Sequence, residues 1–196
     1  MNKLLFFMLL LSIGNTAYAR LFLSPAIGYT AGGKIENESS EYFNIESSEN
    51  YNLSLTTNLD KGRIGLFYSR QDTNVTNQPL SLTMQHLHFQ SAIYYQSSSE
   101  KILPYLGLSL GSTYLDTNWA KSDYEFSASV FGGLEYKFNE TIALQAQLRW
   151  LGILTDSKTY SVCTSSASVE TSKCLIKFES DWLGQVQSNI GMVIKF

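Results

Sequence analysis

The sequence predicts an all-β fold, an eight-stranded antiparallel up-and-down barrel, on the basis of three observations. Apolar and polar residues alternate in short runs through most of the chain, with no convincing amphipathic helix after residue 19. Alternation indicates strands, because successive side chains point to opposite faces of a sheet. The connections between these runs are alternately short and long. The apolar faces also carry aromatic residues near both ends of the strands.

The first 19 residues have the features of a secretory signal peptide. Lys3 supplies a positive charge, Leu4 to Ile13 is almost wholly apolar, and residues 17–19 (AYA) fit the cleavage pattern. A stretch of about 10 apolar residues is too short for a membrane span, which needs ~20. We therefore expect cleavage after Ala19 and one exported barrel domain over residues 20–196.

Eight segments carry the alternation. They lie at about residues 21–31, 51–59, 64–70, 83–96, 102–114, 126–138, 142–150 and 182–196. Short turns follow the second, fourth and sixth segments, whereas the connections at about 35–50, 72–82, 115–125 and 156–181 are long. An even number of antiparallel strands, with short turns at one end and long loops at the other, is typical of a transmembrane barrel.

The apolar faces distinguish a membrane barrel from a soluble one, which would keep its apolar face inside and its charges outside. Here the apolar faces carry almost no charge, and aromatic residues mark both of their ends. These are Tyr29, Tyr51, Tyr68, Tyr114, Phe126, Trp150 and Trp182 at the long-loop end, and Tyr95, Tyr136, Phe138 and Phe196 at the short-turn end. Two aromatic girdles around an apolar band fit a bilayer. We predict an eight-stranded transmembrane β-barrel, and a soluble barrel with inverted faces is the alternative.

The polar faces would then fill the barrel, because eight strands leave an interior just wide enough for side chains. The expected interior polar network consists of His86, His88, Glu135, Lys137, Gln145, Gln147, Arg149, Gln185 and Gln187. Two interpretations remain open. One is a hydrogen-bonded polar plug, and the other is a narrow ion path gated by salt bridges among Glu135, Lys137 and Arg149.

Composition and spacing favour a protein without catalytic activity, metal or cofactor. The net charge of −3 disfavours nucleic acid as a partner, since such partners are usually bound by basic faces. His86 and His88 could share a metal, but the sequence places no acidic or thiol ligand beside them. These histidines lie mid-strand on the inward face, so a Ser–His–acid set for an enzyme acting on lipid A is not expected.

The long loops carry two further features. Cys163 and Cys174, in an exported chain, predict one disulfide within the fourth loop. The first loop is acidic and lacks a compensating cation, with glutamates at positions 36, 38, 41, 46 and 49. It is interpreted as a solvated loop or as one that binds divalent cations or a basic partner at the cell surface.

The chain ends on NIGMVIKF, in which Ile190, Met192, Ile194 and Phe196 share an apolar face. This ending resembles the carboxy-terminal signature of bacterial outer-membrane proteins, which the barrel-assembly machinery reads. The segments PYLGLSLGSTYLD (104–116) and GGLEYKFNETIALQAQLRWLG (132–152) resemble the outer-membrane beta-barrel domain family, to which the OmpA transmembrane domain and OmpX belong. The resemblance covers essentially the whole mature chain. In contrast to full-length OmpA, we expect no periplasmic peptidoglycan-binding domain after the barrel.

The resemblance implies an integral outer-membrane protein of a Gram-negative bacterium, surrounded by lipid and lipopolysaccharide, with periplasmic termini and four extracellular loops. The family is functionally diverse, so the fold alone does not determine a role. The expected role is structural or a cell-surface interaction, namely adhesion or recognition of a surface ligand through the loops, by a monomer without enzymatic activity. A narrow, porin-like channel for ions or small solutes is the alternative.

Overall fold

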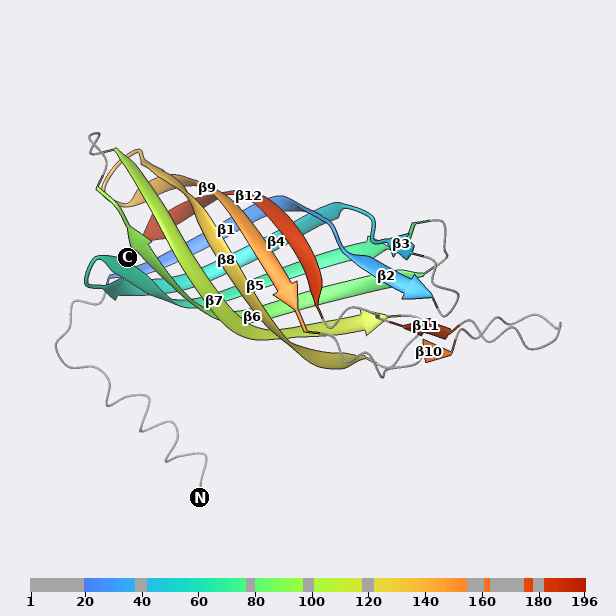
Figure 1. Cartoon of the computed structure of the whole chain (residues 1–196). Coiled ribbons are helices and arrows are strands. Elements are labelled where there is room, and N and C mark those ends of the chain that lie inside the picture. The colour runs from blue at the N-terminus through green and yellow to red at the C-terminus, as the bar shows by residue number, and fades with distance from the viewer. Residues whose placement is uncertain are drawn as a thin grey trace, which may run out of the picture.

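The computed structural model in Figure 1 describes residues 20–37, 42–76, 80–96, 101–117, 122–154, 161–162, 175–177 and 182–196. The predicted signal peptide, residues 1–19, and the predicted disulfide between Cys163 and Cys174 lie outside the described residues. Within the described ranges, the chain contains no helix with the length and apolar character needed to cross a membrane.

Eight strands close into a barrel, as the alternation predicts. They are β1 (Leu21–Ala31), β4 (Ser48–Leu59), β5 (Gly62–Asn74), β6 (Ser81–Tyr94), β7 (Ile102–Thr117), β8 (Asp123–Lys137), β9 (Ile142–Ile153) and β12 (Leu183–Lys195). Each strand pairs antiparallel with its neighbours in chain order, and β12 closes the ring by pairing with β1. The predicted up-and-down barrel is therefore confirmed.

The seam between β1 and β12 explains why the chain stays ordered to its last residue. Leu23 pairs with Ile194 and Ile27 with Ile190 across this seam. The backbone N–H of Phe196 donates a hydrogen bond of 2.9 Å to the carbonyl oxygen of Leu21. A closed ring leaves no strand edge with unpaired backbone groups, which is the condition for β structure in a bilayer.

Four short strands form a second sheet at the long-loop end of the barrel (Figure 1). They are β2 (Lys34–Asn37), β3 (Tyr42–Asn44), β10 (Ser161–Val162) and β11 (Leu175–Lys177), in the order β10-β11-β2-β3. Pairing of Ile176 with Asn37 and of Lys177 with Glu36 joins the first and fourth long connections. The sequence analysis predicts two separate loops here, because pairing between short segments far apart in the chain leaves no local sequence pattern.

The second and third long connections are shorter than predicted. β5 continues to Asn74 and β6 begins at Ser81, so the strands extend into the predicted connection at 72–82; β7 likewise reaches Thr117 and β8 begins at Asp123. On the outer face of the barrel, these strand ends carry mainly polar residues. Arg70 and Asp72 are examples, and their side chains hydrogen bond to each other. Backbone pairing therefore continues beyond the point where outward apolar residues stop marking the strand.

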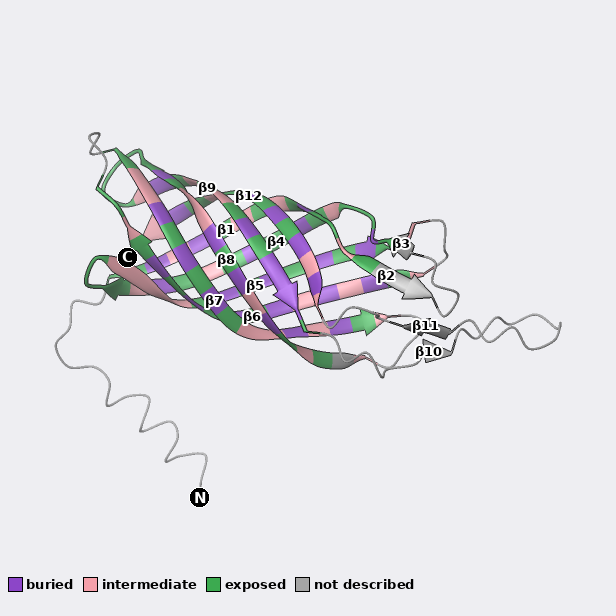
Figure 2. Ribbon diagram, in the orientation of Figure 1, coloured by how far each residue is buried: buried purple, intermediate pink, exposed green. Residues whose placement is uncertain are grey.

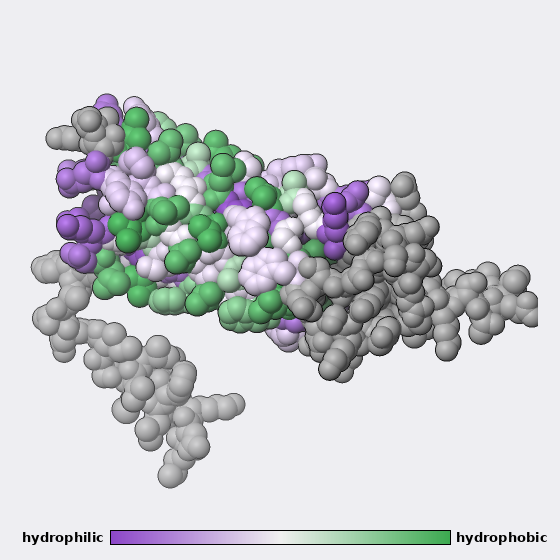
Figure 3. Space-filling model, viewed as in Figure 1, coloured by the Kyte–Doolittle hydropathy of each residue, from purple (hydrophilic) through white to green (hydrophobic). Residues whose placement is uncertain are grey.

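Buried and exposed residues alternate along every barrel strand (Figure 2). The exposed positions include the large apolar side chains of the strand centres, such as Leu66, Leu108 and Leu148, which are 51, 63 and 62 % exposed. Figure 3 shows hydrophobic side chains along the visible face of the barrel wall, while hydrophilic side chains gather at the short-turn end. The apolar face is outside, and the soluble alternative with inverted faces is contradicted.

Candidate functional site

The barrel interior changes character along its length, as the inward positions of β6 illustrate. From the long-loop end these positions carry Leu82, Met84, His86, His88, Gln90, Ala92 and Tyr94. The first two belong to an apolar cluster, the histidines to a polar belt, Gln90 to the surroundings of a buried arginine, and Tyr94 to a charged floor. Each zone is completed by inward residues of the neighbouring strands.

An apolar cap fills the interior at the long-loop end. It consists of Ile45, Val75, Leu82, Met84, Leu115, Leu151, Ile153 and Leu183, each at most 7 % exposed. Ile45 and Val75 lie beyond the barrel strands and are joined by an isolated bridge. The expectation of a polar interior is wrong for this zone. The signal was present in the sequence, because Leu82, Leu151 and Ile153 occupy the phase that carries polar residues elsewhere on their strands.

Below the cap, a polar belt holds both histidines by hydrogen bonds to hydroxyl groups. His86 Nδ1 lies 2.8 Å from Thr113 Oγ1, and His88 contacts Ser109 Oγ at 2.8 Å through Nδ1 and Ser127 Oγ at 2.7 Å through Nε2. Both rings are buried, with centroids 6.1 Å apart. In the described part of the chain no group of three or more His, Cys, Asp or Glu residues could hold a metal. The contacts of the histidines are those of structural polar residues.

Asparagines on the opposite wall extend the polar belt across the closing seam. Asn52 Nδ2 donates hydrogen bonds of 2.8 Å to Asn50 Oδ1 and to Asn189 Oδ1, and Asn50 Nδ2 donates one of 2.7 Å to Thr30 Oγ1. These contacts join β4, β12 and β1. Gln185 and Gln187, which the sequence places in the interior, are also buried on β12.

Arg149 is the most unusual interior residue, because its guanidinium is completely buried. Its Nη1 donates to Ser129 Oγ at 2.7 Å and Ser109 Oγ at 3.0 Å, and its Nη2 donates to Gln90 Oε1 at 2.9 Å. The guanidinium carbon lies 3.7 Å from the ring centroid of Phe67 and 4.2 Å from that of Phe131. We call Arg149 and these two rings the arginine clamp.

The clamp contradicts the salt bridge between Arg149 and Glu135 that the alternative interpretation, a gated ion path, requires. Among the described residues no carboxylate forms an ion pair with Arg149. Two aromatic faces and neutral oxygens take the place of a counter-ion, and cation–π contacts strengthen when they are removed from water. A buried charge is costly unless its donors are satisfied. The clamp therefore depends on Phe67 and Phe131, which sequence reasoning did not assign to the interior.

Glu135 pairs instead with Arg63, a residue that sequence reasoning missed. Arg63 Nη1 donates to Glu135 Oε1 at 2.7 Å and to Tyr94 Oη at 3.1 Å, while Tyr94 Oη donates to Glu135 Oε1 at 2.8 Å. The guanidinium carbon of Arg63 also lies 3.7 Å from the ring centroid of Phe22. We call these four residues the floor. Arg63 lies an even number of residues before Gln71 on β5, so alternation places both side chains on the inward face.

Tyr105 connects the floor to the predicted glutamines. Its ring stacks on Tyr94 at a centroid distance of 5.1 Å, and its hydroxyl accepts hydrogen bonds from the amides of Gln145 and Gln147. A Cβ atom added at Gly133 would collide with the carbonyl oxygen of Ala146 and with the Tyr105 side chain. Glycine at this inward position therefore makes room for an aromatic ring in the barrel.

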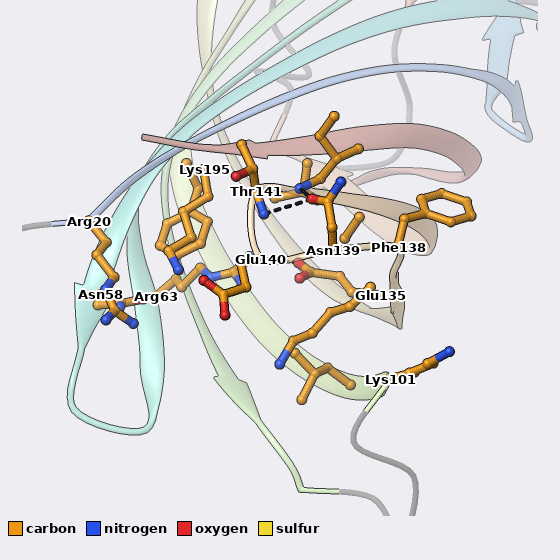
Figure 4. Close-up of a pocket in the computed structure, with 16 residues that line it drawn as sticks. Arg20, Asn58, Arg63, Lys101, Glu135, Phe138, Asn139, Glu140, Thr141 and Lys195 are labelled. Carbon is orange, nitrogen blue, oxygen red and sulfur yellow. Dashed lines mark hydrogen bonds and ion pairs between the residues drawn. The ribbon is translucent and has the colours of Figure 1, made fainter.

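A cavity of about 610 Å³ opens at the short-turn end, and we call it the mouth cavity (Figure 4). The floor residues Phe22, Arg63 and Glu135 line it, and the β8–β9 turn forms one wall. In that turn Asn139 Oδ1 accepts hydrogen bonds from the backbone N–H groups of Thr141 and Ile142 at 2.8 and 2.7 Å. Lys137, which the sequence places on the inward face, also lines the cavity, but its side chain is exposed there and is not buried with Glu135.

The predicted aromatic girdles lie on the outside of the barrel. Tyr29, Tyr51, Tyr68, Phe126 and Trp150 at the long-loop end, and Tyr95, Tyr136, Phe138 and Phe196 at the short-turn end, are exposed. Tyr114 and Trp182 are half-buried because each packs against an aromatic neighbour, Tyr124 at 4.8 Å and Trp150 at 5.9 Å between centroids. Ile190, Met192 and Ile194 of the final strand share this outer face.

The acidic first loop is only partly described. Glu36 lies on β2, Glu46 lies between β3 and β4, and Glu49 lies on β4, whereas Glu38 and Glu41 fall outside the described residues. The backbone N–H of Glu46 donates a hydrogen bond of 2.9 Å to the carbonyl oxygen of Asn74. This segment is therefore anchored to the start of the second long connection.

Comparison with known proteins identifies the fold. Neither a protein-family model nor a curated protein matches the sequence. Among solved structures, the outer membrane protein OprG from Pseudomonas aeruginosa has a TM-score of 0.63 at 12% identity, covering 91% of this chain and 96% of its own. Neisserial surface protein A (NspA) has a TM-score of 0.57 at 14% identity, covering 90% of this chain and 97% of its own.

The N-terminal β-barrel domain of OprF from Pseudomonas aeruginosa is also similar, with a TM-score of 0.50 at 13% identity over 90% of this chain and 97% of that domain. This chain therefore has the fold of small outer-membrane barrels. The resemblance noted from the sequence is borne out at the level of the fold. Identities this low carry no role or ligand from one protein to another.

Proposed function

We propose that this chain is an integral outer-membrane protein whose barrel is a closed scaffold and whose long-loop end interacts with partners at the surface of a Gram-negative cell. The observation that carries the location is the apolar outer wall between the aromatic girdles. Exposed apolar patches on water-soluble proteins rarely exceed a few hundred Å², whereas here every barrel strand exposes large apolar side chains. The same wall would meet lipid and lipopolysaccharide, and the final strand would be read by the barrel-assembly machinery.

The filled interior supports a scaffold without catalytic activity. The apolar cap, the polar belt and the arginine clamp occupy successive levels of the interior with buried side chains. Eight strands leave little further space. A narrow channel, the alternative function, would require both the cap and Arg149 to move aside. It predicts ion conductance in planar bilayers that is lost when Arg149 or Glu135 is replaced, and the scaffold predicts no such conductance.

The distribution of the connections supports surface recognition by the long-loop end. The start of β1 and the end of β12 lie at the opposite, short-turn end (Figure 1). The small sheet of β2, β3, β10 and β11 gives the long-loop end a second ordered unit. Loops held by a rigid scaffold often carry binding function. With periplasmic termini, this unit would face the outside of the cell and would present a surface for adhesion or recognition.

Cysteine labelling of intact cells tests both the location and the orientation. Lys34→Cys lies on β2 and Lys61→Cys lies in the β4–β5 turn, and both positions are exposed. Each is made in a chain whose Cys163 and Cys174 are replaced by Ser. A membrane-impermeant maleimide should label Lys34→Cys in intact cells and Lys61→Cys only after lysis. Labelling of both positions in intact cells, or of Lys61→Cys alone, contradicts the proposal.

A further inference from the structure

We propose that the mouth cavity is a binding site for phosphate-class anions, a role independent of surface recognition at the opposite end. Five cationic side chains line the cavity, those of Arg20, Arg63, Lys101, Lys137 and Lys195, against the two carboxylates of Glu135 and Glu140. The chain as a whole is acidic, with a net charge of −3. The mouth cavity therefore has the opposite sign to the protein that contains it.

The internal ion pair uses only part of this charge. Glu135 is buried and is engaged by Arg63 at 2.7 Å. Arg20, Lys101, Lys137 and Lys195 form no ion pair with any described carboxylate, so Glu140 alone offsets four cations. Cations that line one concave site reinforce each other's field and attract anions from solution.

The floor gives the cavity a fixed shape. Arg63 is held by Glu135, Tyr94 and the ring of Phe22, and its side chain is 12 % exposed. Figure 4 shows Arg20, Arg63 and Lys195 on one side of the cavity, while Lys101 lies at the far edge. The cavity therefore contains a guanidinium that is already positioned, which reduces the ordering cost of binding.

The chemistry of the lining favours a phosphate ester over a simple halide. Phosphate offers several strong acceptor oxygens and more than one negative charge, which match guanidinium and ammonium donors. At about 610 Å³ the cavity exceeds the size of an inorganic ion, and Phe22, Leu103 and Val193 supply apolar lining. These residues would contact the organic part of the ester. The source could be a soluble phosphate ester or the headgroup of a phospholipid.

Backbone amide NMR of the purified barrel in uncharged detergent tests the site. We expect saturable shifts on titration with glycerol 3-phosphate at low ionic strength, centred on residues 101, 137, 140 and 195 and absent at Lys34. The double variant Lys137→Glu/Lys195→Glu should raise the Kd by roughly tenfold or more, since charge-assisted contacts become repulsive. The matched control, Lys34→Glu at the other end of the barrel, should leave the Kd unchanged.

Nanodiscs distinguish the two sources of phosphate. Shifts at the same residues in discs containing phosphatidylglycerol, but not in discs of phosphatidylcholine alone, identify a headgroup ligand. Shifts that require added glycerol 3-phosphate in both discs identify a soluble ester. If the barrel of Lys137→Glu/Lys195→Glu does not fold, the neutral variant Lys137→Gln/Lys195→Gln is measured in its place. Absence of saturable shifts at the mouth with every probe, or an equal effect of Lys34→Glu, overturns the proposal.

Discussion

The two ends of the barrel interior are filled by different kinds of side chain. At the long-loop end an apolar cap is closed by the contacts of aliphatic side chains such as Leu151 and Ile153. At the short-turn end charged groups are buried together in the floor, where Arg63 meets Glu135 and Tyr94. The arginine clamp lies between these two zones, and in it the rings of Phe67 and Phe131 pack against the guanidinium of Arg149. The difference indicates that apolar side chains fill the interior at the long-loop end, whereas a cavity lined by charged side chains opens at the short-turn end.

Removal of the arginine clamp should have the largest effect on stability. Arg149→Ala removes the hydrogen bonds that the guanidinium donates to Gln90, Ser109 and Ser129, and it opens a cavity between Phe67 and Phe131. We expect a loss of about 4 kcal/mol in the free energy of unfolding, combining cavity and hydrogen-bond terms. Urea unfolding in lipid vesicles measures it. The control is Arg70→Ala, which replaces an exposed arginine near the long-loop end of β5 and should leave stability unchanged.

Truncation in the apolar cap should cost somewhat less. Leu151→Ala creates a cavity at a fully buried position, with an expected loss of about 3 kcal/mol. Leu148→Ala removes the same atoms from a position that is 62 % exposed on the outer wall, and its loss should be clearly smaller. Equal losses in the same unfolding assay would mean that the cap is not packed as described.

Neutralising the floor should have an intermediate effect. Glu135→Gln keeps the shape of the side chain but leaves Arg63 without its counter-charge. We expect a loss of about 2 kcal/mol, below the range for fully buried pairs because Arg63 borders the mouth cavity. Glu140→Gln, an exposed carboxylate of the same cavity, provides the matched control. Stability of Glu135→Gln equal to that of this control would contradict the floor.

The smallest effect concerns the outer wall. Trp182 stacks on Trp150 at 5.9 Å between centroids and lies over Gly152, where an added Cβ would collide with its ring. Trp182→Ala should lower stability by about 1 kcal/mol through loss of this stacked pair. Trp182→Phe should recover part of the loss. A larger cost than that of Leu151→Ala would reverse the order of importance assigned to the two faces.

The sequence predicted what depends on a period of two and missed what depends on partners. The outward phases of Leu66, Leu108 and Ile190 follow directly from alternation, and so does the inward phase of Arg149. Alternation does not say which inward residue an arginine meets. The shear of a barrel places Glu135 beside Arg63, from a strand distant in the sequence, and not beside Arg149. The small sheet of paired loops escaped prediction for the same reason.

Heat-modifiability on a gel with washed outer membranes tests the central claim, a closed transmembrane barrel, most directly. Closed barrels resist cold detergent and migrate differently once boiling unfolds them. The account predicts a shift in migration on boiling, with the unboiled protein in the detergent-soluble membrane fraction. An unshifted band together with recovery of the protein in the periplasmic wash would contradict it.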